Sequence, residues 1–189
     1  MNLPNVLTAA RIAAIPVFIL IYFLPFEKAH LFATILYGLA CLTDMLDGYL
    51  ARHLKLTTPL GAFLDPVADK LIVAVPIILV LGHGTLGYIT LPSIIIIGRE
   101  IAVSALREWM AEIGKRSSVA VNFYGKLKTI LQMVAVGSLI FCNHDSALWV
   151  VVVVYVLYYA SAILTLVSMV YYFKAAWPSL IQKNISINS

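Results

Sequence analysis

Apolar stretches long enough to cross a bilayer recur along the whole chain, and four carboxylates lie among them. Hydrophobic residues make up 62% of the sequence and charged residues only 12%. An ionised side chain at the centre of a bilayer costs about 2.5–3.5 kcal/mol even on the mildest insertion scale. Because backbone polar groups in hydrocarbon have to be paired internally, such a chain is restricted to few folds. The composition excludes a soluble domain and predicts an all-α, polytopic membrane protein.

We expect six transmembrane helices within a single domain that covers residues 1–189. The predicted spans are residues 6–25, 31–52, 62–82, 86–110, 119–142 and 147–173. The first span contains Arg11 and Pro16 and has no small-residue cleavage site in a suitable place, so it is predicted to be a retained helix and not a removable signal peptide. The stretch after Lys174 is predicted to be a short interfacial tail.

Positive charges collect at one end of the predicted bundle. The connections on that side hold Arg52, Lys55, Lys115 and Arg116, whereas Lys28 is the single basic residue in the opposite connections. The positive-inside rule therefore places both termini and the acidic cluster on the cytoplasmic side. The net charge of +4 is explained by topology and lipid contact, and it gives no sign of a nucleic-acid surface.

The four carboxylates follow a regular spacing. Asp44 and Asp47 lie three positions apart and Asp65 and Asp69 lie four apart, so each pair shares one face of a helix. A predicted turn at 55–61 lets the two helices run antiparallel, so that the pairs meet at the same depth. Because hard oxygen ligands suit Mg²⁺ or Mn²⁺, the pattern predicts two divalent cations and chemistry on phosphate. A structural ion cluster or a cation-transport site is the alternative.

A second group of charges lies between residues 99 and 128. Arg99 and Arg107 fall on one helical stripe, and an arginine inside a membrane has to face the bundle interior. Lys126 and Lys128 follow in the fifth predicted span. We expect Arg107 and Lys126 to bind an anionic substrate, with Lys128 as a further candidate, and Arg99 to pair with a carboxylate or a phosphate. In the alternative interpretation, Arg99 and Glu100 form a structural ion pair.

The connection between the fourth and fifth predicted spans adds two more cations, Lys115 and Arg116. Ser117 or Ser118 is a candidate N-cap, which would leave the free N–H groups of the next helix directed at an anion. The two cations would then bind a phosphate. The alternative is that they do no more than satisfy the positive-inside rule.

The aspartate region resembles the signature of the CDP-alcohol phosphotransferases at every fixed position. The matching run is Asp44-x-x-Asp47-Gly48-x-x-Ala51-Arg52, followed after eight residues by Gly61-x-x-x-Asp65-x-x-x-Asp69. The resemblance implies an integral membrane enzyme that displaces CMP from a CDP-linked substrate with an alcohol, using two divalent metal ions. It implies metal-ligand roles for the aspartates Asp44, Asp47, Asp65 and Asp69, and our candidate for the general base is Asp69.

Other stretches are similar to one subgroup, the bacterial phosphatidylglycerophosphate synthases. They are residues 5–11, 63–70, 99–109 and 114–118. The resemblance implies CDP-diacylglycerol as donor, sn-glycerol 3-phosphate as acceptor, and a site on the cytoplasmic face of the bacterial inner membrane. The donor is expected at Gly48, Ala51, Arg52 and Gly61. The acceptor phosphate is expected at Arg107, Lys115, Arg116 and Lys126. Membrane lipids would surround the helices, and a homodimer is compatible with the family.

Two kinds of alternative remain open at this point. The same chemistry could use another acceptor, namely inositol phosphate, serine or phosphatidylglycerol, although the basic cluster disfavours serine because serine carries no phosphate. The carboxylates could also form the pathway of a divalent-cation transporter. A transporter should continue the polar track to the far side, but residues 71–81 are apolar throughout.

Overall fold

The computed structural model describes residues 3–54, 59–115 and 123–182. Within these ranges the side chains of residues 3–5, 47–54, 59, 60, 62, 123–126, 180 and 182 are not described. The described residues form six α-helices and no strand, which confirms the all-α prediction. The helices are α1 (Leu3–Tyr22), α2 (Ala29–Leu54), α3 (Pro59–His83), α4 (Thr90–Glu112), α5 (Phe123–Phe141) and α6 (Leu148–Gln182).

Several helix ends differ from those predicted from the sequence; for example, α1 ends at Tyr22 and α4 begins only at Thr90. Two of the differences concern the aspartate motif and the C-terminal segment. Helix α3 already begins at Pro59, so Gly61 lies inside its first turn and not in a connecting turn. Proline at the first position of a helix costs no hydrogen bond, because that N–H has no partner within the helix. Helix α6 continues to Gln182, through Pro178, so the predicted interfacial tail after Lys174 is largely helical. The charge of Lys174 and the helix-breaking tendency of Pro178 favoured the earlier boundary, although the apolar stretch itself continues to Ser179.

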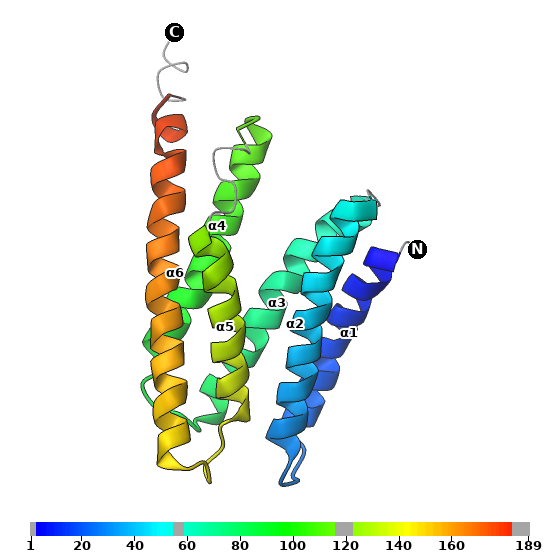
Figure 1. Cartoon of the computed structure of the whole chain (residues 1–189), viewed down its shortest axis with the longest axis vertical. Coiled ribbons are helices and arrows are strands. Elements are labelled where there is room, and N and C mark those ends of the chain that lie inside the picture. The colour runs from blue at the N-terminus through cyan, green and yellow to red at the C-terminus, as the bar shows by residue number, and fades with distance from the viewer. Residues whose placement is uncertain (1–2, 55–58, 116–122, 183–189) are drawn as a thin grey trace.

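The six helices form two groups that meet near one end of the molecule (Figure 1). Helix α1 packs against α2 and α3, while α6 packs against α4 and α5. Contacts of α5 with α2 and α3, together with contacts between α3 and α4, join the groups. We call the end that holds the connections at residues 23–28, 84–89 and 142–147 the far end. The opposite end, where α1 begins and α6 ends, is the cleft end.

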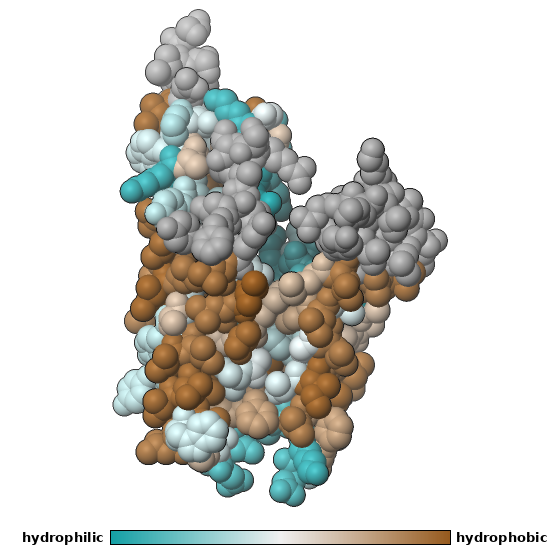
Figure 2. Space-filling model, viewed as in Figure 1, coloured by the Kyte–Doolittle hydropathy of each residue, from teal (hydrophilic) through white to brown (hydrophobic). Residues whose placement is uncertain are grey.

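The main hydrophobic core joins the two groups. Its fully buried members include Ile77 of α3, Ile96 of α4, Leu139 of α5 and Tyr158 of α6. A second, smaller core lies between α4 and α6 and continues toward the cleft end; it consists of Val103, Leu106, Met110, Tyr172 and Ala176. Because the two groups separate at the cleft end, the molecule is hollowed there, and hydrophilic residues lie at the bottom of the notch (Figure 2).

On the face shown in Figure 2, the surface is apolar over most of its height, with hydrophilic residues at the far end and also near the cleft end of the α4–α6 group. Two described stretches, Ala29–Leu46 in α2 and Leu148–Ser179 in α6, are long and apolar enough to cross a membrane. Only 22% and 28% of their residues are buried, so most of these apolar side chains are at least partly exposed. Shorter apolar stretches lie at Val6–Tyr22 and Leu127–Phe141. An outward-facing apolar surface of this extent is typical of a membrane protein.

Candidate active site

The carboxylates of α2 and α3 meet around one arginine of α1. The Nη1 atom of Arg11 lies 2.5 Å from Oδ1 of Asp44 and 3.0 Å from Oδ1 of Asp69. The Arg11 side chain is only 2% exposed, whereas those of Asp44 and Asp69 are 28% and 55% exposed. Asp44 and Asp69 therefore converge from two helices at one depth, as their spacing predicts. Their negative charges are partly balanced by a guanidinium that is permanently charged.

A second contact links α1 to the same cluster. The buried hydroxyl of Thr8 donates a hydrogen bond to Oδ1 of Asp65 over 2.6 Å. Thr8 and Arg11 are three positions apart, so both project from one face of α1. Helix α1 therefore holds aspartates of both α2 and α3.

These aspartates open into a cleft between the two helix groups. A cavity of about 630 Å³ is lined by Asp65 and Asp69 of α3 and by residues of α4 that include Arg107. A neighbouring cavity of about 200 Å³ is lined by Asp44 and Lys128 among others. The two cavities share lining residues, so they form one cleft; the shared residues are Asp69, Arg99, Glu100, Val103 and Arg107. The aspartates and Lys70 thus line one side of the cleft, which we call the aspartate side. Arg99, Arg107 and Lys128 line the other, which we call the cationic side although it also holds Glu100 and Glu108.

The cationic side is built around Glu100 of α4. Lys128 of α5, which is buried, forms an ion pair with Glu100. Arg99 lies 3.5 Å from the same carboxylate, donates a 3.2 Å hydrogen bond to Ser168 of α6 and covers the ring of Tyr172. This network ties α4, α5 and α6 together. The ion pair of Arg99 and Glu100 that the sequence offered as an alternative is present, with Lys128 as a third member.

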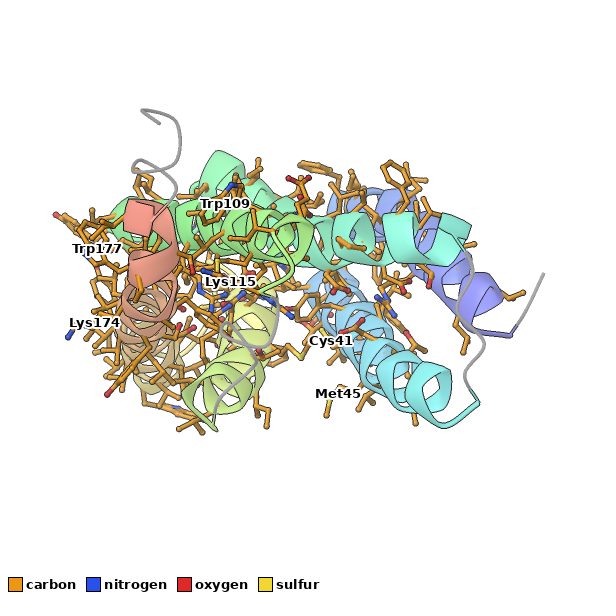
Figure 3. All side chains as sticks on the ribbon, turned by 90° about the horizontal axis from the view of Figure 1, so that it is seen from above. Cys41, Met45, Trp109, Lys115, Lys174 and Trp177 are labelled. Carbon is orange, nitrogen blue, oxygen red and sulfur yellow. The ribbon has the colours of Figure 1, made fainter. Side chains whose placement is uncertain are left out.

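The expected acceptor cations are only partly within the described structure. Arg107 is exposed and lines the cleft, as its helical stripe predicts. Lys115 is half-buried and follows the end of α4; in the view from above it lies among the helices, whereas Lys174 points outward from α6 (Figure 3). Arg116 lies outside the described residues, as do Ser117 and Ser118. Of Lys126 only the backbone, in α5, is described.

Gly114 ends α4 and places Lys115. Its φ of +73° is in the left-handed region, where glycine carries no steric penalty. The N–H of Gly114 donates to the carbonyl of Ala111 over 3.1 Å, and the N–H of Lys115 donates to that of Met110 over 2.8 Å. The second bond spans five residues, as in a Schellman helix end. The direction of the chain after α4 is therefore set by one glycine.

The expected donor residues lie at the facing ends of α2 and α3. Gly48, Ala51 and Arg52 belong to α2, but their side-chain positions, like that of Asp47, are outside the described residues. Gly61 is buried in the first turn of α3. The backbone thus brings the two halves of the aspartate motif to one end of the bundle, near the cleft.

Two residues of the site, Thr8 and Arg11, were not predicted to belong to it. The sequence did contain a sign of Arg11, because an arginine inside an apolar span has to pair with an anion in the bundle interior. Its partners are 33 and 58 positions away in the chain, and no local motif connects them. Lys128 was a further candidate for binding substrate phosphate, but it is paired with Glu100.

The donor chemistry of the carboxylate cluster fits a hard divalent cation. Within the described part of the chain, no three acidic, histidine or cysteine side chains converge closely enough to hold a metal ion as they stand. However, Asp44 and Asp69 already direct one oxygen each at a single positively charged nitrogen, that of Arg11. Carboxylate oxygens are the ligands that Mg²⁺ and Mn²⁺ prefer. The aspartates of this cluster, with Asp65, are therefore the residues that would hold such an ion.

Comparison with known proteins gives matches over nearly the whole chain. Three relatives are each named CDP-diacylglycerol–glycerol-3-phosphate 3-phosphatidyltransferase. The protein of Yersinia enterocolitica is 49% identical over 183 residues, which cover 96% of this chain and 98% of the relative. That of Haemophilus influenzae is 46% identical over 180 residues, covering 95% and 96%. That of Salmonella paratyphi A is 45% identical over 182 residues, covering 96% and 98%.

The family model described as CDP-alcohol phosphatidyltransferase matches residues 1–176. This range includes α1, the complete aspartate motif and the cationic side of the cleft. The chain therefore belongs to the CDP-alcohol phosphatidyltransferase family.

Proposed function

We propose that this protein transfers the phosphatidyl group of CDP-diacylglycerol to sn-glycerol 3-phosphate, which yields phosphatidylglycerophosphate and CMP. The observation that carries the proposal is the cleft, where Asp44 and Asp69 face Arg99, Arg107 and Lys128. An anionic donor and an anionic acceptor both need positive charge, while a phosphoryl transfer needs carboxylates for metal ions and for a base. The names of the relatives, which span this chain almost completely, supply the substrates.

The donor nucleotide is assigned to the facing ends of α2 and α3. Gly48, Ala51 and Gly61 are small enough to let phosphates and ribose come close to the backbone. Arg52 offers a planar fork of donors that suits phosphate oxygens. Divalent ions, held by the aspartates of the motif including Asp47, supply charge neutralisation at the pyrophosphate when they are bound. Mg²⁺ and Mn²⁺ both suit these ligands.

The acceptor is assigned to the cationic side of the cleft. Arg107 lines it, and Lys115 follows the end of α4. We assign Arg116 and Lys126, which follow in the chain, to the same phosphate-binding group. A small dianion such as glycerol 3-phosphate is held by several convergent cations, and a charged phosphate is the feature that these residues can recognise.

Asp69 is assigned the role of general base. It lies on the wall shared by both parts of the cleft, so it can reach a hydroxyl group there. Asp69 takes the proton of the primary hydroxyl, and that oxygen forms a bond to the phosphorus that carries diacylglycerol. The bond from this phosphorus to the CMP oxygen breaks, and CMP leaves with the electron pair. This is a direct displacement without a covalent enzyme intermediate.

We place the protein in the bacterial inner membrane as a single domain with six spans, both termini cytoplasmic and the cleft facing the cytoplasm. The outward apolar surface supports membrane insertion. The positive charges of the connections at the cleft end support this orientation. A nucleotide-linked donor is available on that side. Two copies could pair as a homodimer.

The test is CMP release from CDP-diacylglycerol by the full chain purified in detergent with Mg²⁺. Acceptors are supplied one at a time: glycerol 3-phosphate, inositol phosphate, serine and phosphatidylglycerol. We expect release with glycerol 3-phosphate alone. EDTA and Asp69→Asn should each abolish it, whereas Asp145→Asn, an exposed change at the far end, should not.

Each other outcome overturns a defined part of the proposal. Release with a different acceptor keeps the chemistry and rejects the acceptor assignment. CMP release that persists in EDTA rejects the proposed requirement for divalent metal ions. No release with any acceptor, from protein with a cooperative unfolding transition, rejects the phosphatidyl transfer and favours a divalent-cation transporter.

A further inference from the structure

A single nitrogen atom bridges the two halves of the carboxylate cluster. Nη1 of Arg11 contacts one oxygen of Asp44 on α2 and one oxygen of Asp69 on α3. The guanidinium is almost completely buried, whereas both carboxylates remain partly exposed to the cleft. The cation therefore approaches the aspartates from the inside of the helix group α1–α3, and the cleft lies on their other side.

We infer that Arg11 is a positioning residue of the metal site, a built-in counter-cation that holds Asp44 and Asp69 together and competes with a divalent ion for them. The inference rests on the proposed function, because it takes the aspartates to be metal ligands. It adds a residue that lies outside the aspartate motif and that comes from a different helix.

The charge balance supports this role. The described cluster contains three carboxylates, Asp44, Asp65 and Asp69, and one guanidinium that cannot lose its proton. Without Arg11, the carboxylates would repel each other at short range in a partly buried place, where charges are screened less than in water. With Arg11, one unit of negative charge is cancelled and the remainder is available to an added cation.

Competition follows from the shared oxygens. A cation that binds Oδ1 of Asp44 and Oδ1 of Asp69 has to share both atoms with Arg11 or displace it. The arginine thus lowers the affinity for divalent ions while it keeps the ligands close together in their absence. Removing its charge should make folding more dependent on metal and should make metal binding tighter, by linkage.

The experiment measures thermal unfolding of the full chain in detergent, in EDTA and in a series of Mg²⁺ concentrations. The variants are Arg11→Gln, Arg11→Lys and Arg99→Gln. Arg99 is the matched control, because it is also a buried arginine in an ion pair, but its partner Glu100 is not a proposed metal ligand. No variant needs to be active for this readout.

We expect Arg11→Gln to lower the Tm in EDTA by about 5 °C or more, and Mg²⁺ to restore most of the loss. The Mg²⁺-induced shift should be at least about twice that of the unchanged protein, with a midpoint at about tenfold lower Mg²⁺. Arg11→Lys, which keeps the charge on a shorter side chain, should lie between the two. For Arg99→Gln, the Tm should decrease by the same amount with and without Mg²⁺.

Three results would overturn the inference, and they are distinguishable. A Mg²⁺ shift in Arg11→Gln equal to or smaller than that of the unchanged protein rejects the counter-cation role and leaves the proposed function intact. If Arg11→Gln does not fold even with Mg²⁺, the test passes to Arg11→Lys. A Mg²⁺-induced Tm shift in Arg11→Lys that is no larger than that in Arg99→Gln rejects the counter-cation role. If the unchanged protein shows no shift at any Mg²⁺ concentration, the proposed metal site itself fails.

Discussion

Thr8 of α1 and Asp65 of α3 are joined by a 2.6 Å hydrogen bond, although 57 positions separate them in the chain. Thr8 is fully buried, and its bond holds one oxygen of Asp65 in a fixed direction. For a metal ligand, such a contact restricts the orientation of the carboxylate. Helix α1 therefore helps to fix the orientation of a carboxylate in the site.

Replacing Thr8 by valine should remove this hydrogen bond with little change in volume. We expect a loss of about 1 kcal/mol in the free energy of unfolding and a decrease of about tenfold in kcat/KM for CMP release. Thr34→Val is the matched control, because the Thr34 hydroxyl donates to the carbonyl of His30 within α2. Steady-state kinetics and thermal unfolding of both variants test this. Equal activity in the two variants would contradict a role of Thr8 in the site.

Gly114→Ala should disturb the acceptor end of the cleft through the backbone. An added Cβ meets no atom within 4 Å, so the cost comes from the φ of +73° and should be about 1 kcal/mol. Gly84 has a φ of +72° and equal space at the far end. Both Gly→Ala variants should therefore lose similar stability, but only Gly114→Ala should raise the KM for glycerol 3-phosphate. A raised KM in both variants would show that general destabilisation is the cause.

Glu100→Gln should destabilise the protein more than Lys128→Met does. Glu100 lies between Lys128 and Arg99, so its neutralisation leaves two buried cations without their carboxylate. Removing Lys128 still leaves Glu100 beside Arg99. We expect about 3 kcal/mol for Glu100→Gln and less for Lys128→Met, with the double variant closer to the unchanged protein than Glu100→Gln alone. Chemical or thermal unfolding of the three variants gives the order, and the reverse order would contradict this charge arrangement.

Arg107→Ala should raise the KM for glycerol 3-phosphate by about tenfold or more and leave the KM for CDP-diacylglycerol nearly unchanged. The reason is its position on the cationic side of the cleft. Lys174→Ala removes another exposed charge, one that points away from the cleft, and it should change neither value. Kinetics with each substrate varied in turn provide the measurement. An increase confined to CDP-diacylglycerol would instead place Arg107 at the donor.

Cysteine labelling in cells should reveal the orientation of the helices. Glu112→Cys at the cleft end and Asp145→Cys at the far end both introduce exposed thiols, while the native Cys41 and Cys142 are buried. A maleimide that does not cross the inner membrane should label Asp145→Cys in intact cells, and it should label Glu112→Cys only after the membrane is disrupted. The opposite pattern would invert the proposed topology.

The sequence predicts more of the local structure than of the partnerships between distant segments. The spacing of Asp44, Asp65 and Asp69 was sufficient to predict that carboxylates of two helices meet, because helical periodicity fixes which residues share a face. It did not reveal that Arg11 lies between two of them. That contact depends on how α1 packs against α2 and α3, which is a property of the tertiary structure.

For the cations, the sequence likewise predicted the region but not every partner. Their type and depth predicted a positively charged region, and Arg107 indeed lines the cleft. The choice of partner was not predictable for Lys128, since a buried lysine can bond to a substrate or to a neighbouring carboxylate, and the position of Glu100 on α4 decides in favour of the carboxylate. One helix end was also missed, because α6 continues past Lys174 and Pro178 up to Gln182.

Helix α6 has 35 residues and is therefore about 52 Å long, whereas the hydrocarbon of a bilayer is about 30 Å thick. With the apolar belt placed in the bilayer, its last turns rise out of the lipid together with the end of α4, to which Tyr172 and Ala176 are packed. Figure 1 shows α4 and α6 reaching further along the long axis than α1, α2 and α3. In the proposed membrane placement the cleft entrance is therefore asymmetric: the ends of α4 and α6 extend into water, whereas the ends of α1, α2 and α3 lie close to the lipid surface. A water-soluble reactant can then bind to the protruding ends of α4 and α6, while a lipid reactant can enter from the bilayer over the shorter ends of α1, α2 and α3.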